Sequence, residues 1–254
     1  MEIRFDNKVV LVTGASRGIG KATAMSFAVS GAAVMVHYKS NTEAADLLLK
    51  SLRGKDHRKI AADLAVPVDV ERLVAETIRV FGRIDILVNN AGIFREIEMA
   101  GLDFSSFQKY WTETLDVNLR GPAYLSFLAA KEMIRTGGGK IINISSRGAF
   151  RGEPDAWAYG ASKAGLNALG QSMAKALAPQ KIYVYTLAPG YVNTDMAAFN
   201  LTGEKAQQTA AQSPMNRVAQ PEEIARAVLM LAADGTEYMT GCILDMNGAS
   251  YLRT

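Results

Sequence analysis

The sequence is poor in the residues that build disulfides and metal centres. It contains one cysteine, Cys242, and two histidines, His37 and His57. One cysteine excludes an intrachain disulfide, and so few thiol and imidazole groups argue against a protein-only zinc site. We therefore look for a function that needs neither.

Strong net charge and long apolar runs are also missing. The formal net charge is +3 and no run of Lys or Arg stands out, which argues against a nucleic-acid partner. No apolar run reaches membrane-spanning length, and the first residues lack the apolar core of a signal peptide. We expect a cytoplasmic protein without a membrane partner.

Short apolar segments alternate with longer amphipathic ones. Continuous apolarity over four or five residues is typical of strands buried on both faces of a parallel sheet, so the alternation predicts a doubly wound α/β fold. With no repeat or linker, residues 1–254 are expected to form one domain, and the irregular stretch 192–216 a lid or binding loop. The expected strands are 8–14, 33–38, 58–63, 84–90, 140–145, 182–188 and 242–246, and the expected helices 19–30, 43–52, 69–81, 107–134, 157–178 and 221–232.

A glycine cluster, TGASRGIG at 13–20, follows the first predicted strand and opens the first predicted helix. Gly14, Gly18 and Gly20 allow a sharp turn and the approach of a pyrophosphate to the helix N-terminus. The spacing is G-x-x-x-G-x-G, so a tight structural turn is the competing interpretation. The position after the first strand of an α/β pattern favours dinucleotide binding.

The end of the second predicted strand indicates which dinucleotide is bound. A ribose with a free 2′-hydroxyl is usually held there by a carboxylate, but here the strand ends in His37, Tyr38, Lys39 and Ser40. Arg17 in the glycine cluster and Lys39 are suited to a 2′-phosphate. The competing interpretation is that both are ordinary surface cations. The missing carboxylate favours binding of NADP(H) over that interpretation.

Tyr159 and Lys163 form a Y-x-x-x-K pair on one face of a predicted helix. A cation beside a phenol is expected to lower the phenol's pKa and to suit it to acid–base catalysis. Tyr and Lys four apart also occur by chance, but Ser146 ends the fifth predicted strand, at the edge where open α/β sheets place their sites. Asn118, in the preceding predicted helix, is a candidate to hold a water that links Lys163 to solvent. The competing interpretation is a solvated or capping residue.

Together these residues resemble the classical short-chain dehydrogenase/reductase family. The matching motifs span the chain: TGASRGIG at 13–20, Asp63-Leu64, NNAG at 89–92, Asn118, Ser146, YGASK at 159–163 and PGYVNTDM at 189–196. The resemblance implies a Rossmann-like sheet of seven parallel strands, NADP(H)-dependent interconversion of a carbonyl and an alcohol, and a homotetramer with the helices 107–134 and 157–178 at one interface.

The resemblance also implies roles for individual residues. Tyr159 is the expected acid–base, Ser146 the residue that orients the carbonyl, Lys163 the electrostatic partner of the phenol and a ribose ligand, and Asn118 the anchor of a proton-relay water. The expected cofactor-binding residues come from every motif: Gly14, Ser16, Arg17, Gly18, Ile19, Gly20, Tyr38, Lys39, Ser40, Asp63, Leu64, Asn90, Ala91, Gly92, Tyr159, Lys163, Pro189, Gly190, Val192 and Thr194.

Within the family, the stretch from Arg217 to the C-terminus is most similar to the 3-oxoacyl-[acyl-carrier-protein] reductases, so an acyl thioester on a carrier protein is one expected substrate. Arg147, Gln180 and Tyr185 depart from that group's pattern. A small polar ketone, sugar or cyclitol is the alternative substrate. A non-catalytic NADP(H) sensor is a further alternative, disfavoured because all four catalytic residues are present.

The substrate region carries two arginines of interest, Arg95 and Arg151. We expect them to pair with a negative group of the substrate. Tyr191, directly before the expected lid, and Met196 and Phe199 within it are suited to cover an apolar portion of the substrate. The predicted substrate thus has an apolar segment near the carbonyl and an anion beyond it.

Overall fold

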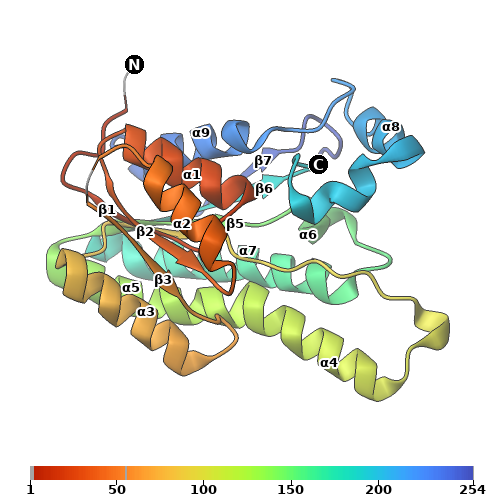
Figure 1. Ribbon diagram of the computed structural model, residues 1–254, viewed down its shortest axis with the longest axis horizontal. Coiled ribbons are helices and arrows are strands. Elements are labelled where there is room, and N and C mark those ends of the chain that lie inside the picture. The colour runs from red at the N-terminus through yellow and green to blue at the C-terminus, as the bar shows by residue number, and fades with distance from the viewer. Residues whose placement is uncertain (1–2, 55, 254) are drawn as a thin grey trace.

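The computed structural model describes residues 3–54 and 56–253, except for the side chains of Phe199 and Asn200. Seven parallel strands form one sheet in the order β3-β2-β1-β4-β5-β6-β7 (Figure 1), which confirms the predicted α/β fold. Each predicted strand lies within two residues of its observed bounds, and these are β1 Val9–Val12, β2 Ala33–Tyr38, β3 His57–Ala61, β4 Ile86–Asn89, β5 Gly139–Ile144, β6 Ile182–Pro189 and β7 Ile243–Met246.

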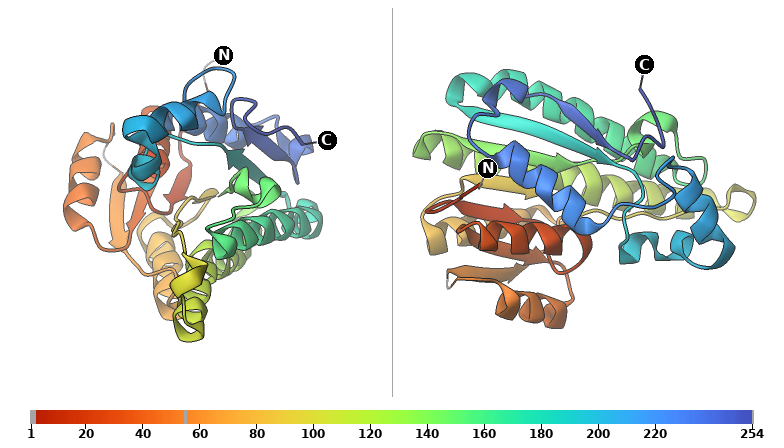
Figure 2. Two further views of the ribbon diagram at one scale, coloured as in Figure 1. Left: turned by 90° about the vertical axis from the view of Figure 1, so that its right-hand side faces the viewer. Right: turned by 90° about the horizontal axis from the view of Figure 1, so that it is seen from above.

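Helices cover both faces of the sheet and bury the strands between two apolar clusters. Phe27 of α1 and Val228 of α9 belong to one cluster, and Leu73 of α3 and Met133 of α5 belong to the other. Figure 2 shows the sheet between these two helical layers. The helices are α1 Gly18–Val29, α2 Thr42–Ser51, α3 Pro67–Phe81, α4 Phe104–Leu115, α5 Gly121–Thr136, α6 Gly148–Arg151, α7 Trp157–Leu177, α8 Gly203–Ala211 and α9 Pro221–Ala232.

The predicted helix over 107–134 is not one continuous α-helix. A π-helical turn, η2 Asp116–Arg120, separates α4 from α5. Pro122 has no N–H to donate to the carbonyl of Asn118 in the α-helical pattern, so the regular ladder is broken here. Such π turns often lie at functional sites, and this one carries Asn118.

The segment 192–216, expected to be irregular, is mostly helical. It contains the 3₁₀ helix η4 Asp195–Leu201 followed by α8. Helix α8, GEKAQQTAA, has few apolar residues, so its periodicity was too weak to predict it. Beyond the carboxyl ends of the strands, α8 lies beside the C-terminal segment, to which Ser213 donates a hydrogen bond at the carbonyl of Gly248 (2.6 Å). No described helix is both long and apolar enough to cross a bilayer.

Candidate active site

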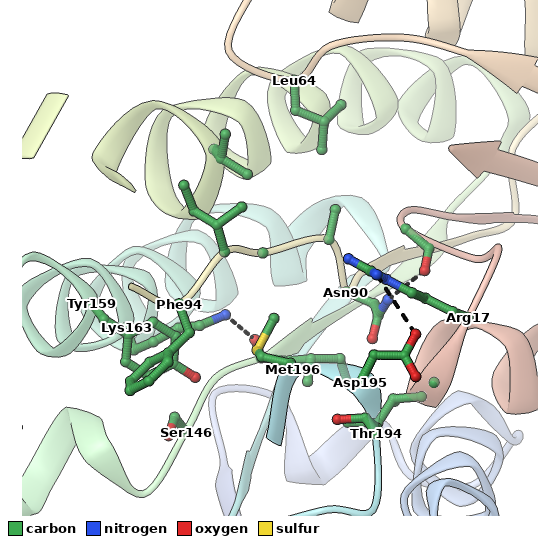
Figure 3. Close-up of a pocket in the computed structure, with 18 of the residues that line it drawn as sticks. Arg17, Leu64, Asn90, Phe94, Ser146, Tyr159, Lys163, Thr194, Asp195 and Met196 are labelled. Atoms are coloured by element: carbon green, nitrogen blue, oxygen red, sulfur yellow. Dashed lines mark hydrogen bonds and ion pairs between the residues drawn. The ribbon is translucent and has the colours of Figure 1, made fainter. Parts of the chain in front are cut away.

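A cavity of about 770 Å³ lies at the carboxyl edge of the sheet. At one end it is lined by Gly14, Ser16–Ile19, Tyr38–Asn41 and Asp63–Ala65, and we call this the glycine-loop end. At the other it is lined by 146–147, 151, 153, 159, 191 and 196, and we call this the tyrosine end. Figure 3 shows Arg17 and Asn90 towards the former, and Ser146, Tyr159 and Lys163 towards the latter.

The glycine-loop end is shaped by close backbone contacts. Gly14 and Gly18 have φ of 61° and 53°, a region that disfavours side chains. A Cβ on Gly20 would lie 2.4 Å from the carbonyl oxygen of Gly14 and 2.5 Å from Nδ2 of Asn90. Asn90 also donates to the carbonyl of Thr13 at 2.8 Å. The backbone N–H groups of the glycine loop, where it enters helix α1, are therefore not covered by side chains of these glycines.

His37 supports this loop from below, a role that the sequence did not reveal. Its Nδ1 accepts a hydrogen bond from the N–H of Gly14 at 3.1 Å, and its Nε2 lies 3.0 Å from the carbonyl oxygen of Ala62. The ring is therefore a neutral tautomer with its proton on Nε2. Burial lowers the pKa of His37 to about 4, so it stays neutral at physiological pH.

The two cations predicted to bind a 2′-phosphate each already have a carboxylate partner. Lys39 lies 2.7 Å from a carboxylate oxygen of Asp63, and Arg17 lies 3.6 Å from one of Asp195. Arg17 and Asp195 are both about 72% exposed, and their pair joins the glycine loop to η4 across the cavity (Figure 3). An exposed pair of this kind is weak and exchanges readily for a stronger ligand.

At the tyrosine end, α7 places Tyr159 and Lys163 one turn apart. Nζ of Lys163 lies 5.7 Å from the centre of the Tyr159 ring and donates to the carbonyl of Ile144 at 2.8 Å. Protein around the Tyr159 hydroxyl raises its pKa to about 12, while a hydrogen bond with Ser146 opposes this rise. The expected lowering of the Tyr159 pKa by Lys163 is not found, and desolvation dominates instead. Desolvation also lowers the pKa of Lys163 to about 8.

Asn118 lies behind this pair in the π turn and is fully buried. Its Oδ1 accepts from the N–H of Ile93 at 2.8 Å, and its Nδ2 donates to the carbonyl of Ile93 at 2.9 Å and to Ser162 Oγ at 3.2 Å. The amide therefore fixes the loop after β4 beside Lys163. Its role in a water relay stays a prediction.

The arginines expected to meet a substrate anion are both engaged with acidic side chains. Arg95 forms an ion pair with Glu113, and Arg151 lies 3.3 Å from Glu153. Arg147, which the sequence marked only as unusual, is the buried one, with 3% of its surface exposed. Charge at the tyrosine end is therefore distributed differently from the prediction.

Aromatic and lid residues complete the tyrosine end. The ring of Phe94, not singled out from the sequence, meets Tyr159 edge-on with ring centres 5.0 Å apart. Tyr191 and Met196 line the cavity as expected, whereas the side chain of Phe199 lies outside the described residues. Phe94 follows the NNAG motif directly, so its position beside that motif was the available signal.

The structure brings nearly all of the predicted site residues to this one cavity. Gly20 and Asn118 are the exceptions, since both lie behind its wall. Among residues 3–54 and 56–253, no group of three potential metal-ligating side chains is found. The lining residues from the predicted set are Gly14, Ser16, Arg17, Gly18, Ile19, Tyr38, Lys39, Ser40, Asp63, Leu64, Asn90, Ala91, Gly92, Ser146, Tyr159, Lys163, Pro189, Gly190, Val192 and Thr194.

Comparisons with known proteins identify the family of this chain. A family model described as enoyl-(acyl carrier protein) reductase matches residues 14–248. A 3-oxoacyl-[acyl-carrier-protein] reductase of Synechocystis is 37% identical over 95% of this chain and 96% of its own length. The chain belongs to the short-chain dehydrogenase/reductase family. As a member of this family, it is an oxidoreductase that interconverts a ketone and a secondary alcohol by hydride transfer.

Solved structures of this short-chain dehydrogenase/reductase family match nearly the whole chain. A short-chain dehydrogenase from Burkholderia cenocepacia in complex with NADP is 32% identical, with a TM-score of 0.88, covering 97% of this chain and 99% of its own. A putative NAD(P)-dependent gluconate 5-dehydrogenase from Beutenbergia cavernae, with bound NADP, is also 32% identical, with a TM-score of 0.88, covering 98% and 99%.

Proposed function

We propose that this oxidoreductase uses NADP(H), with Tyr159 as its acid–base, Ser146 as the residue that orients the carbonyl and Lys163 as their cationic partner. The observation that carries the proposal is the convergence of Ser146, Tyr159 and Lys163 on one cavity whose other end is a glycine loop at a helix N-terminus. A cytoplasmic homotetramer remains a prediction.

The glycine-loop end fits a dinucleotide. The positive φ angles of Gly14 and Gly18 and the missing Cβ atoms leave backbone N–H groups of the loop and of α1 open to a pyrophosphate. Asp63 and Leu64 are placed for the adenine, and Asn90, Ala91 and Gly92 for the middle of the cofactor. Pro189, Gly190, Val192 and Thr194 would frame the nicotinamide, which when bound exchanges a hydride with the substrate carbon.

The residues of the tyrosine end supply the proton. With a pKa of about 12, the Tyr159 hydroxyl is protonated at neutral pH and is ready to donate to the oxygen of a carbonyl being reduced. Ser146, hydrogen-bonded to that hydroxyl, is placed to hold the same oxygen. Lys163 is cationic below a pH of about 8 and favours the phenolate that remains.

The preference for NADP(H) rests on charge. No carboxylate ends β2, and Arg17 and Lys39 both line the glycine-loop end. A phosphate dianion forms stronger charge-assisted hydrogen bonds than a single exposed carboxylate does, so it would displace Asp195 from Arg17. Lys39 would then bridge the phosphate and Asp63.

Two substrate classes have support. The 36–37% identical relatives are 3-oxoacyl-[acyl-carrier-protein] reductases, which favours an acyl thioester. The tyrosine end, however, carries Arg147, Arg151 and Glu153, and this polarity favours a small polar ketone. A non-catalytic NADP(H) sensor is the outcome if no ketone is turned over.

The test is Tyr159→Phe together with cofactor titration. We expect the variant to lose turnover by about 100- to 10,000-fold while NADPH binding stays within about twofold, because only the hydroxyl is removed. Wild-type protein should bind NADPH more tightly than NADH. Substantial turnover by the variant would show that another group is the acid, and equal binding of NADH would overturn the cofactor preference.

A further inference from the structure

Arg147 is a buried cation held by neutral groups. Its guanidinium donates to Ser250 Oγ and to Gln212 Oε1, and its central carbon lies 4.9 Å from the centre of the Tyr191 ring. Among the described residues, no carboxylate forms an ion pair with it. Arg147 also lines both the 770 Å³ cavity and a neighbouring cavity of about 470 Å³, so it stands in the wall between them.

The charges nearest to Arg147 leave a positive excess. Arg151 and Glu153 pair with each other at 3.3 Å and so neutralise each other. Burial and the charge of Arg151 both lower the pKa of Arg147, to which Glu153 and Tyr191 give only partial compensation. Together with Lys163, Arg147 therefore leaves the tyrosine end with more positive than negative charge.

The other arginines of the two cavities show how unusual this is. Each has a carboxylate within ion-pair distance and is more exposed than Arg147. A buried charge without a counter-ion costs several kcal/mol, and a ligand that brings the opposite charge offsets this cost. These paired arginines are Arg17 with Asp195, Arg95 with Glu113, Arg151 with Glu153, Arg217 with Glu223 and Arg253 with Asp245.

We propose that the natural substrate is the anion of a short oxo acid or hydroxy acid and that Arg147 binds its carboxylate. The two η nitrogens of Arg147 now donate to two separate neutral acceptors, and a carboxylate offers two oxygens that match this fork. Arg147 and Ser146 line the same 770 Å³ cavity, so the proposal places the carbonyl of a short oxo acid at Ser146 and its carboxylate at the guanidinium. This inference rests on the proposed function and selects the small polar ketone over the thioester.

The test compares short oxo acids with their own methyl esters, with NADPH as reductant. Wild-type protein should have the higher kcat/KM for the acid. In Arg147→Met the ratio of acid to ester should fall by about 10- to 100-fold, because a charge-assisted pair is lost. Arg95→Met, which removes an arginine of the same cavity that is already paired, should leave the ratio within about twofold.

If Arg147 had only a structural role, Arg147→Met would lower kcat/KM for the acid and for the ester by the same factor. An unchanged ratio in Arg147→Met, or a wild-type preference for the esters, overturns the proposal. If Arg147→Met does not fold, Arg147→Lys keeps the charge but loses the fork, and its ratio should still fall measurably. Tyr159→Phe separates the two claims, because it should abolish turnover of acid and ester alike whether or not Arg147 reads charge.

Discussion

The two ends of the cavity are built in different ways. At the glycine-loop end, short-range motifs and close backbone contacts form the surface, and Gly14, Gly18 and Gly20 act by having no side chain. At the tyrosine end, long side chains from distant segments meet, as where Arg147 contacts Gln212 and Ser250. The first end is therefore intolerant of added atoms, and the second is sensitive to changes in charge and hydrogen bonding.

Gly20→Ala should break the first half of this comparison most strongly. The new Cβ would lie 2.4 Å from the carbonyl oxygen of Gly14, so the loop must shift. We expect NADPH affinity to fall by about 10- to 100-fold, from an overpacking cost of about 1–3 kcal/mol. Titration by fluorescence measures it. Gly101→Ala, with nothing within 4 Å of the added Cβ, is the matched control, and equal effects would refute the argument.

His37, beneath the glycine loop, makes the free energy of unfolding depend on pH. Its pKa is lowered to about 4, so the unfolded chain binds a proton that the folded chain rejects between about pH 6.5 and 4. Its contribution to stability is complete above this window and is lost as the pH falls, by about 3 kcal/mol in all.

Urea unfolding across this window measures the effect. The variant His37→Asn keeps an acceptor for Gly14 but does not titrate, so its free energy of unfolding should fall less with pH than that of the wild type. Identical slopes for the two proteins would assign the acid sensitivity to other groups.

Arg17→Ala sharpens the comparison. At the glycine-loop end, where backbone groups form most of the surface, Arg17 is expected to bind the cofactor through its side chain. We expect about tenfold weaker NADPH binding with NADH binding little changed, since one charge-assisted contact to the 2′-phosphate is removed. Parallel titration of both cofactors checks this. Equal losses for the two would place Arg17 on the pyrophosphate they share.

Asp195→Asn should have the smallest effect. Asp195 pairs with Arg17 across the cavity at 3.6 Å and competes with a phosphate for it. Removing this competition should tighten NADPH binding by about two- to threefold, the range of an exposed ion pair. Weaker binding would show that Asp195 helps to close η4 over the cofactor instead.

Sequence reasoning succeeded where local pattern determines structure. Buried parallel strands are apolar runs, and motifs at their carboxyl ends meet at one edge, so the sheet and most lining residues were predictable. The π turn at Asp116–Arg120 and helix α8 were not, because one lies inside a helical pattern and the other has a weak apolar face.

Side-chain partners were the least predictable feature. Lys39 with Asp63, Arg17 with Asp195 and Arg95 with Glu113 are pairs between segments far apart in the chain, and periodicity contains no information about them. The burial of Arg147 has the same origin, since its neighbours Gln212, directly after α8, and Ser250, in the C-terminal segment, are distant in the chain. From the sequence we expected Arg95 and Arg151 to bind a substrate anion. Only the structure shows that these two are paired and that Arg147 is the buried arginine without a carboxylate partner.

The contact between Arg147 and Ser250 also concerns how the protein is made. Chains fold from their N-termini as the ribosome releases them, and strands β1 to β4 with the glycine loop emerge long before residue 250. Arg147 is therefore synthesised well before Ser250, a partner that is 103 residues away. Until the segment that carries Ser250 has docked, Arg147 lacks one of its hydrogen-bond partners, so the tyrosine end of the cavity is completed late.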